Sequence, residues 1–464
     1  MHVIAFPYGE ALAAFAAVAD DPFCAFLDSA AAGDPRARWS YIATDPFCVI
    51  TADGLGTRVD GRPVGMDPFT ALHAQLAAHG GADLRGPAPF LTGAVGFLGY
   101  ELGRHLERLP AARDIGPAIP EMAFGLYDTV AAFDHAERRA FILSSGRPQA
   151  DPAARQERAR ARAQWLHDRL AGAPAVPPRP DWRARGRFIP EQPRAEVEQA
   201  TARVIEYIQA GDIFQANLTH RMRAAVPEGL SDLELYLRLR EESPAPFAAF
   251  LKCGPGLSVM SASPERFLSL APDGRVETRP IKGTRPRGAD PAADAAMARD
   301  LLASAKDRAE NLMIVDLMRN DLGRVSRTGS VRVPVLCGLE TFASVHHLVS
   351  VVESTLQSGL GPVDLLRACF PGGSITGAPK IRAMEIIHEL EGAPRGVYCG
   401  SVAWIGFDRA MDSSIVIRTV TRAGGTLLAQ AGGGIVADSD PGAEYEESLV
   451  KLAPLLRALS GDDR

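Results

Sequence analysis

Prolines crowd the stretch between residues 171 and 180, and this stretch limits the folds that the chain can adopt. Proline donates no backbone hydrogen bond, so neither a helix nor an interior strand can run through so many of them. The stretch therefore predicts a stiff linker, residues 171–187, between two regions. A chain of 464 residues is also too long for one ordinary core. We expect two or more subdomains, with one large α/β body as the alternative.

The regions on the two sides of the linker differ in pattern. Residues 1–170 contain short strand-like runs between Gly and Pro turns, and end in an Arg- and Ala-rich segment that favours a helix. After the linker, apolar residues at helical spacing predict an amphipathic helix between Glu191 and Gly211. The next segment, 213–221, alternates apolar and polar residues as a strand does.

Charge and cysteine usage exclude several classes of protein. The formal net charge is −6, and no basic stripe with interleaved aromatic residues appears, which argues against binding to nucleic acid or to a membrane surface. The six cysteines are scattered without metal-ligand spacing and suit a reducing compartment, where we expect them to be buried apolar residues. Neither a signal peptide nor a membrane-spanning run is evident. We therefore expect a soluble cytoplasmic protein.

Lysine is scarce in this chain. Among 50 basic residues, lysine occurs at only five positions (252, 282, 306, 380 and 451), and subtracting these leaves 45 arginines. A position that keeps lysine under this bias is a candidate for chemistry that arginine cannot perform, since an amine can lose its proton and attack carbon. Lys282, between Pro280 and Gly283, is the strongest candidate. The alternative is an ordinary solvated cation.

A hairpin brings a carboxylic acid toward Lys282. Asp273-Gly274 lies between two strand-like runs, 265–270 and 275–281, and this dipeptide favours a two-residue hairpin turn. With that turn, Glu265 would oppose Lys282 on the same face, roughly 5 Å apart at Cβ. A change of one residue in the loop would break this register. A surface ion pair that contributes little is the alternative interpretation.

Two pairs of carboxylates occur at helical spacing. Asp307 and Glu310 lie three residues apart in a segment that reads as a helix, and Glu444 and Glu447 repeat the spacing, with Lys451 four residues later. The members of each pair share one helix face. If the two faces met, they would form a hard-oxygen site suited to Mg²⁺. Solvated faces are the alternative.

Other polar and glycine-rich positions stay open on pattern alone. The glycine clusters in 371–380 and 432–434 are tight turns by default, although backbone amides in the second could hold an anion. Arg418 lies in an apolar run and needs a carboxylate from the protein or from a ligand. His347 shares a predicted strand face with two valines, which favours a core histidine. The polar face of 213–221 is typical of a solvated strand, with a cleft lining as the alternative.

In order and spacing, these motifs resemble those of the chorismate-utilising enzymes. The motifs are Ser263-Pro264-Glu265, Pro280 through Thr284, Glu310 through Asp321, His347-Leu348, Pro371 through Lys380, and Gly432 through Glu447. The resemblance covers roughly residues 188–455, and Gly96 through Glu101 resembles the N-terminal region of the family. It implies an α+β fold: a large two-subdomain body with mainly antiparallel sheets in a central sandwich flanked by helices. It also implies an N-terminal region, 1–170, and a chorismate-binding catalytic domain, 188–460.

Two positions indicate a branch within the family. Anthranilate synthases carry a small residue where this chain has Lys282, and isochorismate and salicylate synthases carry a lysine where it has Gln215. The resemblance therefore implies amination of chorismate at C4, toward 4-aminobenzoate and folate. A separate glutamine amidotransferase subunit would supply the ammonia.

The resemblance also implies a role for each site residue. Lys282 would attack C2 of chorismate, Glu265 would protonate the leaving C4 hydroxyl, and His347 would orient the ring. Mg²⁺ would be held by Glu310 and Glu447, with Asp307 and Glu444 behind them. The implied substrate-binding residues are Arg418, Tyr398, Thr376, Gly377, Gly433, Gly434, Lys451 and Gln215. Related proteins hold tryptophan in their N-terminal region, which here would lie near 27–29 and 244–247.

Three rival functions remain on sequence grounds. The first is an anthranilate synthase component I, which would give the 2-amino product. The second is a non-catalytic regulator that binds chorismate or tryptophan without turnover. The third is a pyridoxal-phosphate enzyme that uses Lys282 as a Schiff base, although the sequence shows no recognisable phosphate cup.

Overall fold

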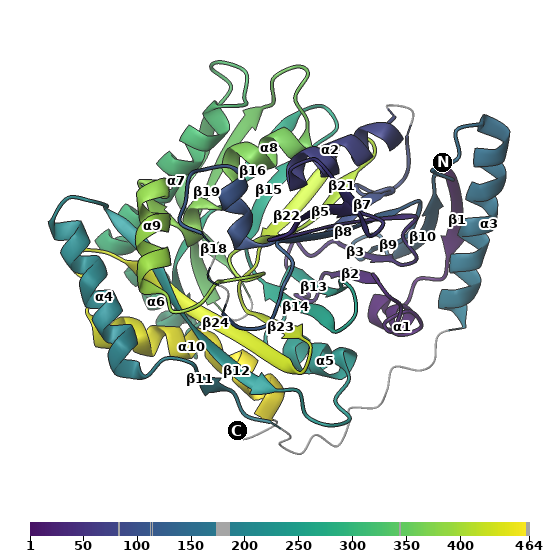
Figure 1. Cartoon of the computed structure of the whole chain (residues 1–464). Coiled ribbons are helices and arrows are strands. Elements are labelled where there is room, and N and C mark those ends of the chain that lie inside the picture. Colours follow the sequence, from purple (N-terminus) through teal and green to yellow (C-terminus); the bar gives the residue numbers. More distant parts are fainter. Residues whose placement is uncertain (82–83, 112, 114, 173–185, 343–344, 461–464) are drawn as a thin grey trace.

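Two antiparallel sheets of twelve strands each organise the described part of the chain (Figure 1). The computed structural model describes residues 1–464 except 82–83, 112, 114, 173–185, 343–344 and 461–464. Most of the predicted linker, 171–187, therefore lies outside the described residues.

The first sheet runs through both regions of the chain. In spatial order its strands are β1 (His2–Phe6), β10 (Arg139–Ser144), β9 (Thr129–Asp134), β3 (Trp39–Ala43), β2 (Ala25–Asp28), β13 (Phe247–Lys252), β14 (Leu257–Ser263), β23 (Thr419–Ala423), β24 (Thr426–Ile435), β12 (Gln215–Ala225) and β11 (Ile189–Pro190), with β20 (Gly377–Ala378) on β12. The second sheet comprises β17 (Ile281–Pro286), β19 (Val345–Thr355), β16 (Arg275–Thr278), β15 (Arg266–Leu270), β22 (Met411–Ile415), β21 (Ser401–Gly406), β7 (Gly93–Leu98), β8 (Met122–Tyr127), β4 (Cys48–Asp53), β5 (Gly56–Val59) and β6 (Arg62–Val64), with β18 (Arg332–Thr341) on β19.

Strands from before and after the linker are direct neighbours in both sheets. In the first sheet β2 pairs with β13, where Phe26 opposes Phe250. In the second sheet β7 pairs with β21, where Phe97 opposes Val402. Each sheet is therefore complete only when both regions contribute. The predicted division into 1–170 and 188–460 follows the order of the chain, whereas the sheets combine the two regions.

The two sheets face one another as a sandwich, and the alternation of side chains along each strand shows it. Leu251 and Val259 belong to the core shared by both sheets, whereas their neighbours Phe250 and Met260 point to the opposite face and pack against helices. The prediction of an α+β sandwich of mainly antiparallel sheets flanked by helices is confirmed.

Helices cover the outer faces of the sandwich (Figure 1). They are α1 (Ala11–Ala16), α2 (Pro68–His79), α3 (Pro152–Ala171), α4 (Arg194–Gln209), α5 (Asp232–Glu242), α6 (Pro291–Ala303), α7 (Ala305–Gly323), α8 (Pro362–Cys369), α9 (Lys380–Leu390) and α10 (Pro441–Ser460), with 3₁₀ turns η1 (Tyr100–His105) and η2 (Gly373–Ile375). Helices α1, α3, α5 and α10 pack on the first sheet, and α2, α7 and α8 contribute to the core of the second. The helices predicted near 151–170, 191–211 and 304–317 are confirmed as α3, α4 and α7.

Two further sequence predictions concern the interior. All six cysteines are buried and unpaired, as expected. Among the helices of the described residues, none is long and apolar enough to cross a bilayer.

Candidate active site

Lys282 lies near the start of β17, on a strand that is irregular at the next residue. Lys282 opposes Leu348 of β19 and Thr284 opposes His347, so the register shifts at Gly283 between them. Gly283 has a φ of +77°, which favours glycine, and a Cβ there would lie 2.9 Å from side-chain atoms of Asp307. The irregular strand therefore fits closely against α7, and a larger residue at 283 would push the two apart.

The predicted two-residue turn at Asp273-Gly274 is wrong. The backbone nitrogen of Ala271 donates to the carbonyl oxygen of Arg275 at 2.8 Å, so the loop between them has three residues. Gly274 takes the left-handed conformation, with a φ of +88°. A three-residue loop ending in a left-handed glycine is the next most common hairpin connection after the two-residue loop.

The extra loop residue also changes the predicted partner of Lys282. β15 pairs with β16 so that Ser269 opposes Glu277, one residue away from the predicted register. The strand with Lys282, β17, pairs with β19 and not with β15, so Glu265 does not oppose Lys282 across a hairpin. The Lys282 charge nevertheless acts on the Glu265 carboxyl and opposes the rise in its pKa.

Glu265 is a buried carboxyl suited to general-acid chemistry. It precedes β15 and is only 7% exposed. Burial raises its pKa to about 7, against the opposing effects of a hydrogen bond with Ser374 and of the Lys282 ammonium. A carboxyl with a pKa near neutrality is partly protonated at neutral pH and can donate its proton to a leaving group.

Gln215 and Lys282 flank the space that Gly434 leaves open. A Cβ at Gly434 would lie 1.8 Å from Nε2 of Gln215 and 3.5 Å from Nζ of Lys282. Within the described residues, Lys282 Nζ forms no hydrogen bond or ion pair, and Oε1 of Gln215 lacks a hydrogen-bond partner although the residue is 1% exposed. A buried amide oxygen without a partner is costly, so it indicates a polar ligand at this point.

The glycine cluster 432–434 belongs to strand β24, so its interpretation as a tight turn is wrong. A Cβ at Gly432 would lie 1.9 Å from the backbone oxygen of Leu218 on β12. At Gly433 it would lie 2.9 Å from Oε2 of Glu444, while Lys451 Nζ donates to the Gly432 oxygen at 2.8 Å. The glycines therefore let β12 and α10 approach β24 closely.

The polar face of β12 is buried, so its interpretation as a solvated face is wrong. Asn217 and Thr219 are less than a tenth exposed. Thr219 donates from its backbone nitrogen and its hydroxyl to Glu391, at 2.9 and 2.8 Å. Asn217 donates its backbone N–H to the carbonyl of Thr376 at 2.7 Å. The neighbouring Gly377 packs against the backbone of Gln215, because a Cβ at Gly377 would lie 2.2 Å from the backbone oxygen of Gln215.

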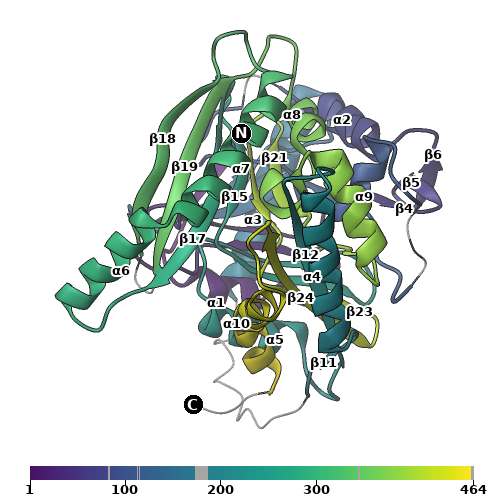
Figure 2. The ribbon, with the colours of Figure 1, turned by 90° about the vertical axis from the view of Figure 1, so that its left-hand side faces the viewer.

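The two carboxylate pairs lie on helices that contact one another. α7 begins after Ser304, whose hydroxyl accepts from the backbone nitrogen of Asp307 at 3.2 Å. In the first turn of α7, Lys306 approaches Glu444 of α10 with an Nζ to Oε1 distance of 3.5 Å. Figure 2 shows this side of the molecule, with α7 and β17 next to the group formed by β12, β24 and α10. The two helix faces therefore meet.

Several charged side chains surround Glu310 and shift its pKa. Burial raises the pKa of Glu310, and the carboxylates of Asp307 and Glu444 add to this effect, whereas Lys282 and Lys306 oppose it. Desolvation disfavours the charged form of Glu447, but the cations around it, first of all Lys451 at 2.8 Å, outweigh that effect and lower its pKa. A divalent cation would relieve the repulsion around Glu310.

Glu310 and Glu447 would supply only some of the ligands of a bound Mg²⁺. Among the described residues, no three acidic, His or Cys side chains are grouped closely enough to enclose a metal ion. Instead Glu444 and Glu447 are paired with Lys306 and Lys451. Mg²⁺ needs only one or two carboxylates and keeps its other positions for water and substrate oxygens, so Glu310 and Glu447 suit it.

His347 and Arg418 form a second part of the site. His347 is buried, and its Nδ1 shares a hydrogen bond of 2.9 Å with the hydroxyl of Thr284. Burial, with the Arg418 charge second, lowers the pKa of His347 to about 4, so the imidazole is neutral near pH 7. Arg418 has a φ of +50°, and its guanidinium forms no hydrogen bond or ion pair with any described residue. Burial lowers the pKa of this guanidinium. A ligand carboxylate is the partner that remains for Arg418.

The segment that carries Tyr398 adjoins the segment that carries Arg418. The backbone nitrogen of Cys399 donates to the carbonyl of Val416 at 2.8 Å. Tyr398 itself is buried. The segment that carries Tyr398 therefore lies beside the segment of Arg418, whose charge acts on His347 of β19.

Three residues near the site escaped prediction. Ser374 contacts Glu265, Lys306 pairs with Glu444, and Arg395 forms a buried ion pair with Glu391 at 2.6 Å. The scarcity of lysine could have pointed to Lys306. Of the five lysines, Lys282, Lys306 and Lys451 all act on the carboxylates of Glu310 or Glu447. Neither Ser374 nor Arg395 has a local signal, because their partners are distant in sequence.

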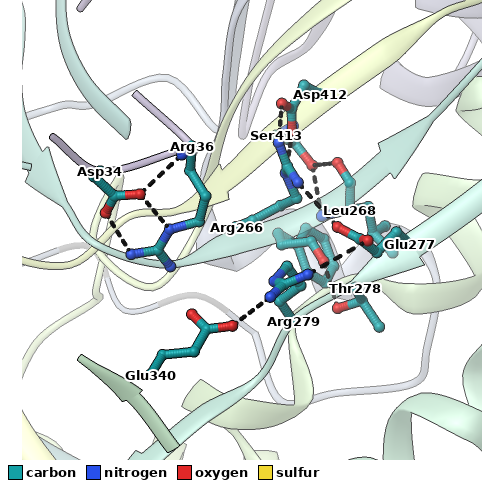
Figure 3. A network of polar contacts seen from close by, with 11 residues as sticks. Asp34, Arg36, Arg266, Leu268, Glu277, Thr278, Arg279, Glu340, Asp412 and Ser413 are labelled. Carbon is teal, nitrogen blue, oxygen red and sulfur yellow. Dashed lines mark hydrogen bonds and ion pairs between the residues drawn. The ribbon is translucent and has the colours of Figure 1, made fainter. Parts of the chain in front are cut away.

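A polar network links β15, β16 and β22 next to Glu265 (Figure 3). Arg266, next to Glu265, binds both oxygens of Asp412 at 3.0 Å and donates to Glu277 at 3.0 Å. Arg279 approaches the other oxygen of Glu277 at 3.6 Å. Bidentate contacts of this kind fix orientation as well as distance.

A cavity of about 580 Å³ lies where a tryptophan pocket was expected. Its lining includes Leu27, Asp28 and Ser29 of the N-terminal region together with Pro246 and Phe247.

Comparisons with known proteins identify the family. The family model described as "chorismate binding enzyme" matches residues 23–457. The chain is 43% identical to aminodeoxychorismate synthase component 1 of Klebsiella aerogenes, over 96% of this chain and 95% of that protein. It is also 43% identical to anthranilate synthase component 1 of Streptomyces coelicolor, over 86% of this chain and 78% of that protein. The crystal structure of anthranilate synthase component I from Streptococcus pneumoniae superposes with a TM-score of 0.80 at 30% identity, covering 91% of this chain and 92% of that one.

Proposed function

This chain belongs to the family of chorismate binding enzymes, and from that membership we propose that it is the component of an aminodeoxychorismate synthase that aminates chorismate at C4. The observation that carries the proposal is Lys282, a lysine that forms no ion pair with the described residues and whose charge acts on the buried acid Glu265. The identity of about 43% over almost the whole chain supports the same branch. Similar identity to an anthranilate synthase component makes amination at C2 the second candidate.

Lys282 and Glu265 divide the first half of the reaction between them. The Lys282 amine attacks C2, both conjugated ring double bonds shift toward C4, and the bond from C4 to its hydroxyl oxygen breaks. Glu265 protonates that oxygen, so water leaves and the substrate stays bound to Lys282. Ammonia then adds at C4, both double bonds shift back, and the bond to Lys282 breaks. The Lys282 amine is thereby regenerated, and the product is 4-amino-4-deoxychorismate.

The remaining site residues would hold and orient the substrate. Arg418 and Tyr398 would receive the enolpyruvyl carboxylate, and neutral His347 would orient the ring. The ring would be lined or held by Thr376, Gly377, Gln215, Lys451 and the amides of Gly433 and Gly434. Mg²⁺ on Glu310 and Glu447, with Asp307 and Glu444 behind them, would supply a counter-charge for the ring carboxylate.

Two further partners belong to this proposal. The name "component 1" of the Klebsiella relative supports a second subunit, which we propose is a glutamine amidotransferase that supplies ammonia. We also propose that the cavity at Leu27–Ser29 and Pro246–Phe247 accepts tryptophan, since its volume of about 580 Å³ suits a small ligand.

The identity of the product tests the proposed function. The purified chain is incubated with chorismate, an ammonium salt and Mg²⁺, and the products are separated and identified by NMR. We expect 4-amino-4-deoxychorismate. Anthranilate would assign the chain to C2 amination, and chorismate binding without turnover would make it a regulator.

A further inference from the structure

A small pocket between η1 and α9 is lined by none of the residues assigned to the reaction. Its volume is about 30 Å³, room for one or two small polar groups. Tyr100 and Glu101, which end the motif that begins at Gly96, line it together with Arg104, Arg113 and Arg395. We call this site the Tyr100 pocket. The motif singled out in the sequence therefore ends at a site that the reaction does not use.

Two polar groups in the Tyr100 pocket are buried without a partner. The hydroxyl of Tyr100, a residue 7% exposed, forms no hydrogen bond within the described residues. Nη1 of Arg104 is likewise buried and unpaired, although Nε of the same side chain donates to the Pro110 carbonyl at 2.7 Å. Buried donors without acceptors are rare in folded proteins, and two on one pocket indicate a missing acceptor.

The charges around the pocket favour an anion. Glu101 already accepts from the backbone nitrogens of Arg395 and Gly396, at 3.0 and 2.9 Å. Glu391 is taken by the Arg395 guanidinium at 2.6 Å. Within the part of the chain that the structure describes, Arg113 donates only to backbone carbonyls, those of residues 388, 389 and 391.

Among the described residues that line the Tyr100 pocket, three arginines face two carboxylates, both already bound. Burial, with the nearby arginines, lowers the pKa of the lining His388, so this side chain is neutral near pH 7. A carboxylate has two acceptor oxygens, fits the excess positive charge and can accept from both unpaired donors.

The inner wall of the Tyr100 pocket contacts the part of the site that lines the ring. Arg395 stacks on the Tyr100 ring at 4.5 Å. Its guanidinium donates to the carbonyls of Ile375, at 2.7 Å, and of Asn217, at 2.5 Å. Ile375 adjoins Thr376, and Asn217 lies two residues after Gln215 on β12. Arg395 therefore connects the pocket to the segments that line the ring.

We propose that the Tyr100 pocket receives an acidic side chain of the subunit that supplies ammonia. This inference rests on the proposed function, because it assumes that such a subunit exists. The acidic side chain accepts from Tyr100 and Arg104 and seats the partner over η1 and α9. Docking there places the source of ammonia on the side of the molecule where Arg395 contacts the ring-lining segments.

Two variants of the pocket and one control test the docking site. Tyr100→Phe removes one unpaired donor without changing shape, and Arg104→Glu reverses the charge. Arg139→Glu, at a side chain 60% exposed on β10, is the matched charge reversal away from the pocket. The dissociation constant of the purified glutamine amidotransferase subunit from the same organism is measured by calorimetry. Amination is measured with glutamine in the complex and with ammonium salt on the chain alone.

We expect Arg104→Glu to weaken binding of the subunit at least tenfold and Tyr100→Phe to weaken it about threefold. Glutamine-driven amination falls accordingly, whereas ammonium-driven amination stays within twofold of the wild type, which shows that both variants fold. Arg139→Glu changes neither. If Arg104→Glu loses ammonium-driven activity as well, Tyr100→Phe decides the outcome.

Dissociation constants within twofold of the wild type for both pocket variants would overturn the docking site. A wild-type chain that binds no amidotransferase subunit would overturn it too. Failure of the proposed function looks different: the wild-type chain would then form no 4-amino product with ammonium, whatever the binding measurements give.

Discussion

At the scale of single residues, burial rather than the neighbouring lysine sets the acidity of Glu265. Burial is the largest influence on this carboxyl, and the Ser374 hydrogen bond and the Lys282 charge only reduce the upward shift of its pKa to about 7. An ion pair with Lys282 alone would have lowered the pKa instead. The acid therefore depends on the residues that exclude water from it.

This dependence predicts the pH profile of the enzyme. With free ammonia held constant, kcat/KM is expected to fall as pH rises above about 7, because Glu265 loses the proton that it must donate. Glu265→Gln should lower the rate by about 10²- to 10⁴-fold and abolish this fall. Initial rates between pH 6 and 9 check it. An unchanged profile in the variant would show that another group donates the proton.

The same carboxyl affects stability. Its pKa rises from an ordinary 4.5 to about 7 on folding, so between these pH values the folded state binds more protons than the unfolded state. Stability from this group is therefore present below pH 4.5 and lost as pH rises through 7. Above pH 7, Glu265→Gln should raise the free energy of unfolding by up to about 3 kcal/mol. Urea unfolding at pH 5 and pH 8.5 measures it, and an equal effect at both values would contradict it.

Some residues of the site could be predicted from the sequence and others could not. Lys282 stood out because lysine is scarce, and the spacing of Asp307 with Glu310 placed both on one helix face. The burial of Gln215 had no local signal, because it arises from Gly377 and Gly434, which are far away in the chain. Burial is a property of the assembled fold, and sequence spacing does not contain it.

At the scale of elements, two glycines of β24 have different roles. Gly432 allows β12 and β24 to pair, and Gly434 leaves space for Gln215 in the site. At Gly432 a Cβ would meet backbone of β12, whereas at Gly434 it would meet the flexible end of Gln215. Gly432→Ala should therefore destabilise the fold by about 3 kcal/mol or more, since the two strands must separate. Gly434→Ala should leave the melting temperature within a few degrees and raise the KM for chorismate about tenfold by displacing Gln215.

Thermal unfolding and steady-state kinetics of both alanine variants, each measured against the wild type, test this difference. Equal stability of the two variants would contradict the assignment of Gly432 to strand pairing. An unchanged KM in Gly434→Ala would remove Gln215 and the space beside it from the binding site.

Local sequence predicted helices of this fold better than strand pairing. α4 follows from the apolar residues at helical spacing between Glu191 and Gly211, and in the structure Ser304 caps the start of α7. The Asp273-Gly274 signal located the hairpin but not its length, because a three-residue loop with a left-handed glycine uses the same residues. The departure of β17 toward β19 depends on a strand more than 60 residues away, which no local pattern specifies.

At the scale of the whole molecule, the linker does not separate two independent sheets. β2 pairs with β13, and β7 with β21, so the interior of both sheets includes strands from either side. The fold class was predictable from the resemblance, but this interleaving was not, because a Pro-rich stretch predicts only the position of a linker. Pairing between distant strands is decided by the complete core.

Splitting the chain tests the interleaving. We expect the segments 1–172 and 186–464, produced separately, to unfold without a cooperative transition, because each would expose unpaired strands of both sheets. Mixing the two should restore a cooperative transition and activity with ammonium. Circular dichroism during heating measures this, with the intact chain as control. Cooperative unfolding of either segment alone would contradict the account.

Covalent attachment of the substrate to Lys282 tests the central claim most directly. The chain is incubated with chorismate and Mg²⁺ without ammonia, digested and examined by mass spectrometry. The account predicts that the peptide containing Lys282 gains the mass of chorismate less one water, and that Lys282→Ala gains nothing and forms no 4-amino product. An unmodified peptide, together with full activity of Lys282→Ala, would contradict it.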